Sequence, residues 1–263
     1  MYDFTFSKPS TLPDALKLLS TDDEAKALAG GQTFIPVLKQ RLNKPTQVID
    51  LSALGLGGIT MEANTITIGA MSNHHSIMSD PNIQSRIPGL AKMASWIGDT
   101  QVRHRGTMGG SLANNDPAAC YPAAVLALGA TIHTDHRSIH ADDWFQGMFT
   151  TALEPGELIT KVSFPIPELS NYEKFRNPAS RYAMVGVFVA RGPAGIRVAI
   201  TGAGQGGVFR HTEMEQALAA NWSPDAIKGI KTPSDDLNGD IHASPEYRAH
   251  LIGVMARRAI AAA

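Results

Sequence analysis

Hydrophobic positions in the N-terminal part of the chain switch between a two-residue period and a three-to-four-residue period. Alternation predicts strands, and the longer spacing predicts amphipathic helices. Ser10 or Thr11 can cap the first helix, and Pro13 suits its first turn. The pattern predicts strands at 2–6, 25–29 and 47–51 and helices at 13–19 and 34–42. Two strands joined by a helix over this distance indicate a βαβ unit, which pairs its strands in parallel.

Turn residues and prolines divide the middle of the chain into short elements. Asn64 separates two alternating runs and predicts a β-hairpin of 58–61 with 65–70. Ser72 is expected to cap a helix, and Pro81 and Pro88 to begin new helical turns before Gly98. Further along, the pattern predicts an apolar helix at 118–128 that ends at Gly129, a strand pair within 130–140, a short helix or loop at 144–151 and a strand at 159–164.

The residue composition changes after Phe164. Two prolines and several polar residues between 165 and 171 are typical of a linker. A chain of 263 residues is long enough for one large core or two modest ones. We therefore expect two domains, 1–167 and 168–263.

The second domain is expected to contain strands followed by helices. Alternating runs bounded by glycine predict strands at 183–190 and 195–201, and a helix is predicted at 212–220. Ser244 is expected to cap the terminal helix, with Pro245 in its first position. The residues along one side of that helix are Tyr247, Leu251, Val254, Met255 and Arg258.

Composition and charge exclude several classes of protein. Hydrophobic residues make up 43% and charged residues 18% of the chain, as in ordinary globular proteins. The formal net charge of −1 gives no basic field for nucleic acid, and no apolar run is long enough for membrane insertion. The N-terminus lacks the pattern of a secretory signal. A single cysteine, Cys120, excludes an internal disulfide and an iron–sulfur cluster held by this chain alone, and it fits a cytoplasmic location.

Two glycine pairs are candidate ligand loops, at 29–33 (Ala-Gly-Gly-Gln-Thr) and 107–111 (Thr-Met-Gly-Gly-Ser). Glycine lets the backbone approach a ligand, and the start of a following helix presents unpaired N–H groups that suit a pyrophosphate. A branched side chain at Gly30 is therefore expected to block such a ligand. One pair alone is more simply a turn or a helix cap. Two pairs favour a ligand without naming it, because neither matches a standard nucleotide motif.

Other polar residues lie close to these loops. Arg103–Arg105 is a positive patch that can face a phosphate, a partner protein or solvent. Asn114 and Asp116 supply amide and carboxylate groups suited to ribose or ribityl hydroxyls. The stretch 174–183 mixes cations with aromatic residues, so it either reaches a planar ring or simply leads into a strand. Cys120 begins an apolar helix, where packing is the simpler role.

No metal site and no catalytic residue is expected. His74 and His75 are neighbours on a helix and point apart, so they do not chelate one ion. His133, His136 and His140 lack the spacing of a zinc site. The chain also contains no Gly-x-Ser-x-Gly element of a hydrolase.

With both loops in place, the chain resembles the FAD-binding medium subunit of the molybdenum hydroxylases, the xanthine dehydrogenase and aerobic carbon monoxide dehydrogenase family. Residues 29–33 match that family's first loop, Ala-Gly-Gly-His/Gln-Ser. Residues 103–113 match its second loop, Arg-x-Arg-Gly-Thr-Ile-Gly-Gly-Ser-x-Ala. Ile68–Ala70, the helix at 122–130 and the stretch 174–186 match as well, so the similarity covers nearly the whole chain.

The resemblance implies an α+β fold. An FAD-binding domain of the vanillyl-alcohol-oxidase or PCMH type has two α/β subdomains with the cofactor between them, and a small α/β domain like the C-terminal domain of carbon monoxide dehydrogenase flavoproteins follows. It also implies an electron-transfer subunit. Such a subunit accepts single electrons from a small subunit with two [2Fe–2S] clusters and passes them to an external acceptor. A large molybdopterin subunit oxidises the substrate, and the complex is a dimer of heterotrimers.

The resemblance places the cofactor-binding residues around both loops and at the start of the second domain. They are Leu28, Ala29, Gly30, Gly31, Gln32, Thr33, Ile68, Gly69, Ala70, Arg103, Thr107, Gly109, Gly110, Ser111, Asn114, Asp116, Lys174 and Tyr182. Gln32 replaces the histidine that carries covalent flavin in related oxidases, so noncovalent FAD is expected.

Two departures from the family pattern concern the flavin environment. Cys120 stands where many members carry an acidic residue, and Tyr182 and Ala183 follow Ser180 and Arg181 where xanthine dehydrogenases carry an acid. Two alternatives to electron transfer stay open from the sequence. One is a stand-alone flavin oxidase of the same fold, and the other is a non-catalytic assembly subunit that has lost the cofactor.

Overall fold

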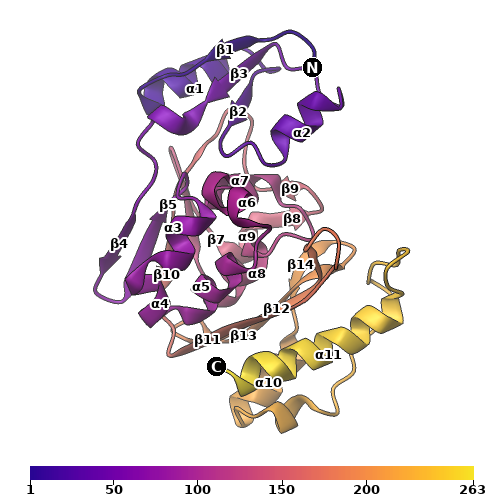
Figure 1. Ribbon diagram of the computed structural model, residues 1–263. Helices are drawn as coiled ribbons and strands as arrows, with labels where there is room; N and C mark the ends of the chain where they lie inside the picture. Colours follow the sequence, from indigo (N-terminus) through magenta and orange to yellow (C-terminus); the bar gives the residue numbers. More distant parts are fainter.

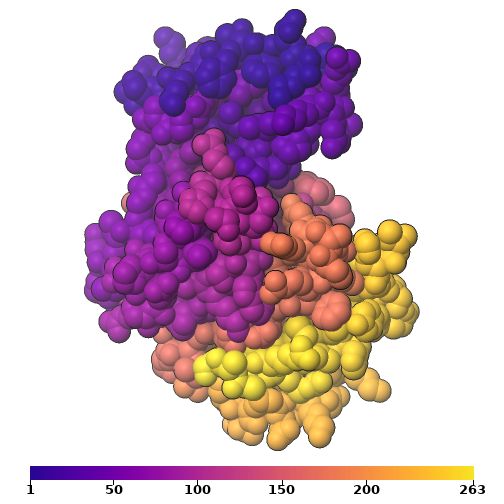
Figure 2. All heavy atoms as spheres, viewed as in Figure 1, coloured from indigo at the N-terminus to yellow at the C-terminus, as the bar shows by residue number.

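The N-terminal strands form a small parallel sheet in the computed structural model, which describes residues 1–263 (Figure 1). β3 (Gln47–Asp50) lies between β1 (Thr5–Ser7) and β2 (Lys26–Leu28) and pairs with both in parallel. The helix α2 (Phe34–Lys39) connects β2 to β3, so the predicted βαβ unit is confirmed. Figure 2 shows this part as a lobe above the rest of the molecule.

Two helices of this lobe differ slightly from the sequence prediction. α1 (Leu12–Ser20) begins after Thr11, whose hydroxyl accepts a hydrogen bond from the backbone N–H of Asp14. The cap is therefore Thr11 and not Ser10. α2 ends three residues before the predicted position 42, because Arg41 takes a left-handed conformation with φ of 59°.

The middle of the molecule is a five-stranded antiparallel sheet surrounded by short helices. Its strands are ordered β4-β5-β10-β6-β7, and the predicted hairpin and strand pair are both present. The strands are β4 (Ile59–Glu62), β5 (Thr65–Gly69), β6 (Thr131–Thr134), β7 (Ser138–His140) and β10 (Ile159–Pro165). The helices are η1 (Leu51–Ala53), α3 (His74–Ser79), α4 (Pro81–Arg86), α5 (Pro88–Ser95), α6 (Thr100–Arg105), α7 (Met108–Asn114), α8 (Tyr121–Leu128) and α9 (Ala141–Trp144).

Several local predictions for this region are wrong. Asn73 caps α3, while the Ser72 hydroxyl is committed to the backbone of Gly58. α8 begins at Tyr121 and not at 118, because Asp116 holds the preceding residues in a turn. Residues 144–151 form the end of α9 and a hairpin of β8 (Phe145–Gly147) with β9 (Thr150–Thr151). The end of α8 at Gly129, with φ of 60°, is as predicted.

The C-terminal part is a four-stranded antiparallel meander with helices on one face (Figure 1). Its elements are β11 (Leu169–Arg176), β12 (Ala183–Gly192), β13 (Gly195–Gly204), β14 (Gly207–Arg210), α10 (Thr212–Ala220), η2 (Pro224–Ile227) and α11 (Pro245–Ala261). Val185 and Val187 of β12 pack in a core with α10 and α11. Phe188 on the opposite face packs with α8 and the middle sheet. Because both faces are covered, the first eight residues of β12 are buried, and the predicted alternation between buried and exposed positions is wrong there.

The buried face of the terminal helix differs from the side that the sequence pattern predicts. Ser244 and Pro245 begin it as expected. Leu251 and Met255 face the core, whereas Tyr247 is 43% exposed and Arg258 also faces solvent. None of the helices in the structure combines the length and the apolar character that crossing a bilayer needs.

The two predicted domains share part of one core. β10 ends at Pro165 and β11 begins at Leu169, so three residues separate the two strands. Tyr172 and Phe188, beyond this connection, pack with Tyr121 before it. The boundary at 168 stays a prediction.

Candidate functional site

Both glycine loops line one cleft of about 680 Å³ between the N-terminal lobe and the middle of the molecule. A Cβ added to Gly30 would collide with the carbonyl oxygen of Arg105, which leads into the second loop. A Cβ added to Gly110 would lie 3.5 Å from the Cβ of Ala29. The loops are therefore in direct contact, and the cleft lies in the size range of small-molecule sites.

The first loop has unsatisfied backbone donors. No protein acceptor takes a hydrogen bond from the backbone N–H groups of residues 30–34. Thr33 precedes α2 without making a side-chain cap, and Gly31 has φ of 74°, which favours glycine. Five consecutive free N–H groups beside a cleft suit an anionic ligand such as a pyrophosphate.

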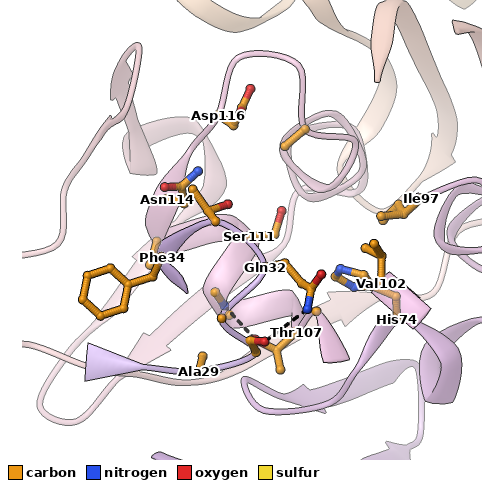
Figure 3. Close-up of a pocket in the computed structure, with 18 of the residues that line it drawn as sticks. Ala29, Gln32, Phe34, His74, Ile97, Val102, Thr107, Ser111, Asn114 and Asp116 are labelled. Atoms are coloured by element: carbon orange, nitrogen blue, oxygen red, sulfur yellow. Dashed lines mark hydrogen bonds between the residues drawn. The ribbon is translucent and has the colours of Figure 1, made fainter. Parts of the chain in front are cut away.

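The second loop is built differently. The N–H groups of Met108 and Gly109 donate to the carbonyl oxygens of Ser72 and Ala70, at 3.1 and 2.8 Å. The Gly110 N–H donates to Thr107 Oγ1 at 3.2 Å (Figure 3). A Cβ at Gly109 would lie 2.6 Å from the Cβ of Ala70, so this glycine is required by packing. The expectation that both loops present bare amides is thus wrong for the second, which offers side chains such as Ser111 instead.

Most of the expected cofactor-binding residues line the cleft. They are Ala29, Gly30, Gly31, Gln32, Thr33, Ala70, Thr107, Gly109, Gly110, Ser111, Asn114, Asp116, Lys174 and Tyr182. Figure 3 shows Gln32, Thr107, Ser111, Asn114 and Asp116 around it. Their direct contact with a cofactor stays a prediction.

The other four expected residues, Leu28, Ile68, Gly69 and Arg103, do not line the cleft. Ile68 is fully buried in the core. The Leu56 carbonyl oxygen lies so close to Gly69 that there is no room for a side chain at this position. Arg103 lies in the last turn of α6, and its guanidinium donates to the carbonyl oxygens of Ile97 and Gly98 at 3.1 and 3.2 Å. Its side chain therefore supports the α5–α6 connection.

The cleft also contains residues that the sequence analysis set aside or missed. His74 is buried and lines it, together with Val102 of the unpredicted helix α6. Burial and the nearby Arg103 lower the pKa of His74 to about 4, so its imidazole is neutral near pH 7. Asp99, a good helix cap, was the available signal for α6.

The C-terminal part closes one side of the cleft through Lys174 and the segment that contains Tyr182. Lys174 Nζ donates to the carbonyl oxygens of Trp96 and Arg181 at 2.7 and 3.1 Å, and it lies 3.5 Å from Cys120 Sγ. Tyr182 is half exposed, and burial together with the charge of Asp116 raises its pKa. A buried ammonium and a tyrosine hydroxyl thus join the site from the far end of the chain.

A second cluster of ionisable groups lies near the cleft. His136, Glu154 and Glu157 are the only group of side chains close enough together to share a metal ion. Arg137, however, donates to both oxygens of Glu157 at 2.7 Å. These bonds lower the pKa of Glu157 to about 2. The guanidinium therefore already supplies the positive charge that the carboxylates need.

Comparisons with known proteins agree with this architecture. Residues 2–167 match the family model described as the FAD binding domain in molybdopterin dehydrogenase. The glyceraldehyde dehydrogenase medium chain of Sulfolobus acidocaldarius is 33% identical, over 98% of this chain and 97% of its own. The nicotine 6-hydroxylase medium subunit of Paenarthrobacter nicotinovorans is 34% identical, over 97% and 95%.

A solved structure shows the same fold over the full length. A chain of the Cu,Mo-CO dehydrogenase, in a cyanide-inactivated form, superimposes with a TM-score of 0.87 and 30% identity, over 99% of this chain and 98% of that chain. The expected PCMH-type FAD domain with a C-terminal domain is confirmed. The chain therefore belongs to the FAD-binding subunits of the molybdopterin-dependent dehydrogenases, in the family of carbon monoxide dehydrogenase and xanthine dehydrogenase medium subunits, and is an FAD-binding oxidoreductase subunit.

Proposed function

We propose that this chain is the electron-transfer subunit of a molybdopterin-dependent hydroxylase or dehydrogenase complex. It accepts single electrons from the [2Fe–2S] clusters of a small partner subunit and delivers them to an external acceptor. A large molybdopterin subunit carries out substrate oxidation. The observation that carries the proposal is the cleft itself, which is lined both by the first loop, with five free backbone N–H groups, and by side chains of the second.

The residues of the cleft fit FAD. The N–H groups of residues 30–34 suit its pyrophosphate, and Asn114 and Asp116 suit its hydroxyls. Gln32 has no imidazole, so the cofactor is held without a histidyl bond. When bound, FAD supplies the junction between one-electron and two-electron transfer. Lys174 contributes a fixed positive charge, because its donors are already engaged with the protein.

The composition of the chain supports partner subunits. One cysteine is too few to ligate an iron–sulfur cluster, so the clusters must lie in another chain. The relatives named above are medium chains or subunits, which implies other subunits in their complexes. We extend the proposal to a dimer of heterotrimers in the cytoplasm, where the free and buried Cys120 would stay reduced.

The two alternative functions are less well supported. A stand-alone oxidase needs a base in the cleft. Of the two cleft carboxylates, Glu157 is bound to Arg137, and Asp116 accepts a hydrogen bond from the backbone N–H of Ala118. Lys174 Nζ has protein partners for its three donors. An assembly subunit without a cofactor does not need the free N–H groups of residues 30–34. The cleft therefore favours electron transfer.

The test combines the isolated chain with its reconstituted complex. The isolated chain should retain FAD and turn yellow, yet it should not oxidise aldehydes, carbon monoxide or N-heterocycles. Rapid mixing of the complex with its substrate should reduce the flavin only when the cluster-bearing subunit is present. Steady turnover by the isolated chain would establish the oxidase instead. A colourless chain that does not bind added FAD would support the assembly role instead.

A further inference from the structure

His74 and Tyr121 form a buried pair at the wall of the cleft. His74 is the first residue of α3, and its backbone N–H donates to the carbonyl oxygen of Gly106 at 3.0 Å. Its Nδ1 lies 3.3 Å from the Tyr121 hydroxyl, and the ring centroids are 5.3 Å apart. His74 is 5% exposed and Tyr121 is fully buried. Both rings are therefore held in one position.

The hydrogen-bonding needs of Tyr121 decide the tautomer of His74. The buried Tyr121 hydroxyl has no other hydrogen-bond partner in the structure. If His74 Nδ1 carried the proton, the buried tyrosine O–H would have no acceptor, and leaving a buried donor unsatisfied destabilises the folded state. Tyr121 therefore donates to Nδ1, and the neutral imidazole carries its proton on Nε2.

His74 Nε2 is available to a ligand. Nε2 has no hydrogen-bond partner in the protein, and it is not one of the fully buried polar atoms that lack a partner. Because His74 lines the cleft, a ligand can reach this atom from there. A Cβ at Gly106 would lie 2.5 Å from Nε2, so glycine leaves this atom uncovered. A Cβ at Gly30 would lie 2.9 Å from the Cα of Gly106. Gly106 therefore lies close to both the His74 ring and the first loop. Figure 3 shows the ring among the cleft residues.

We infer that His74 donates a hydrogen bond from Nε2–H to an acceptor oxygen of the bound FAD, and that Tyr121 is the positioning residue that fixes this tautomer. The inference rests on the proposed FAD cleft. The donor is uncharged, so it recognises an oxygen without adding a positive charge to the cofactor. Lys174 remains the buried charge of the site.

A matched pair of variants tests this assignment. In His74→Gln the side-chain amide reaches the place of Nε2, whereas in His74→Asn it reaches only the place of Nδ1 and the Tyr121 hydroxyl. We expect His74→Asn to weaken FAD binding about 10-fold if the acceptor is a neutral flavin oxygen and up to about 100-fold if it is a charged phosphate oxygen. His74→Gln should lose less than about 5-fold. A purely structural role predicts the reverse order, because only His74→Asn keeps the contact with Tyr121.

Binding of ADP and FMN to the same variants shows which half of the cofactor accepts the bond. A loss for ADP assigns the acceptor to the ADP half of the cofactor, and a loss for FMN alone assigns it to the flavin half. Equal affinity of wild type and His74→Asn for all three ligands overturns the inference. Failure of the wild type to bind FAD overturns the proposed function instead, which separates the two results.

The tautomer is measurable without any ligand. ¹⁵N NMR of the wild-type imidazole should show a protonated Nε2 and a bare Nδ1 near neutral pH, and Tyr121→Phe should yield a mixture of tautomers. A proton on Nδ1 in the wild type overturns the inference even if the His74 variants do not fold.

Discussion

Three glycines of the site are required by contacts within the protein. Gly30, Gly106 and Gly109 each lie so close to a neighbouring residue that a Cβ would collide with it. The sequence alone predicts that Gly30 leaves room for the ligand, and loss of FAD in a Gly30→Val variant would fit that prediction. The structure gives a second cause for the same loss, because the side chain would first push the two loops apart.

Gly30→Ala is therefore expected to destabilise the chain in the absence of FAD. The new methyl group meets backbone atoms of Arg105, which cannot rotate away, and overpacking of this kind costs about 1–3 kcal/mol. Thermal unfolding of the apo chain measures the effect. Gly229→Ala is the control, because an added Cβ there has nothing within 4 Å. Equal Tm values for the two variants would show that Gly30 is reserved for the ligand alone.

His74 also makes the stability of the fold depend on pH. Its pKa is about 4 in the folded chain and 6.5 as the reference value, so only the unfolded chain binds a proton between these values. The stability that depends on a neutral His74 is fully present above pH 6.5 and is lost as the pH falls toward 4. Between about pH 7 and about pH 5 the free energy of unfolding should fall by about 2 kcal/mol from this group.

Urea unfolding of wild type and His74→Gln at both pH values isolates this term. The comparison is needed because burial also lowers the pKa of His133 and His211, while Asp135 raises that of His136. The variant should lose less stability on acidification than the wild type by about 2 kcal/mol. Parallel pH profiles of the two proteins would show that His74 titrates normally.

At the scale of elements, Asn115 joins the second loop to the β8–β9 hairpin. It ends α7 in a left-handed conformation with φ of 43°, and it is 2% exposed. Its amide donates to the carbonyl oxygens of Gly147 and Thr150 at 2.8 and 2.9 Å. One side chain therefore ends the helix and also fixes the neighbouring hairpin.

Asn115→Ala should lower the free energy of unfolding by about 2–4 kcal/mol. Two partly buried hydrogen bonds are lost, at about 0.5–1 kcal/mol each, and alanine in a left-handed conformation costs about 1–2 kcal/mol more. Asn115→Gly loses the same bonds without that conformational cost, so it should be the milder variant in urea unfolding. If glycine proves as damaging as alanine, the backbone conformation contributes nothing.

The elements that the sequence predicted well are those with local signals. Thr11, Ser244 and Gly129 mark helix ends by their own chemistry, and the βαβ unit and the hairpin follow from periodicity. The predictions failed where tertiary contacts decide. β12 is buried on both faces, so its pattern carries no alternation, and the late start of α8 depends on a turn held by Asp116.

The same division holds for the candidate site. The two glycine pairs mark candidate ligand loops by their own backbone chemistry, the resemblance to a known family adds the identity of the ligand, and the structure brings the loops together in one cleft. The hydrogen bonds that satisfy residues 108–110 come from Ala70, Ser72 and Thr107, and their geometry could not be read from the sequence. The sequence favours a solvated or capping role for His74, because its burial and its contact with Tyr121, 47 positions along the chain, are tertiary features.

At the scale of the whole molecule, the cleft is lined by all three parts of the chain. The N-terminal lobe contributes residues 29–34, the middle contributes 106–107 and 109–111, and the C-terminal part contributes Lys174 and 180–182. A ligand that fills the cleft therefore contacts segments from both ends of the sequence. Such a ligand stabilises the folded state against every opening that releases it.

Hydrogen exchange measures this coupling segment by segment. FAD at about 100 times its dissociation constant should slow amide exchange in residues 30–34 by up to about 100-fold, because these N–H groups are free in the protein alone. Residues 108–111 should already exchange slowly in the absence of FAD, since their N–H groups donate to protein acceptors. Residues 180–182 should be protected by FAD but not by ADP, because the resemblance places the flavin ring on the side of the C-terminal part.

Protection of residues 108–111 in place of 30–34 would contradict the difference between the two loops. Equal protection of 180–182 by ADP would place the adenine half, and not the ring, beside the C-terminal part.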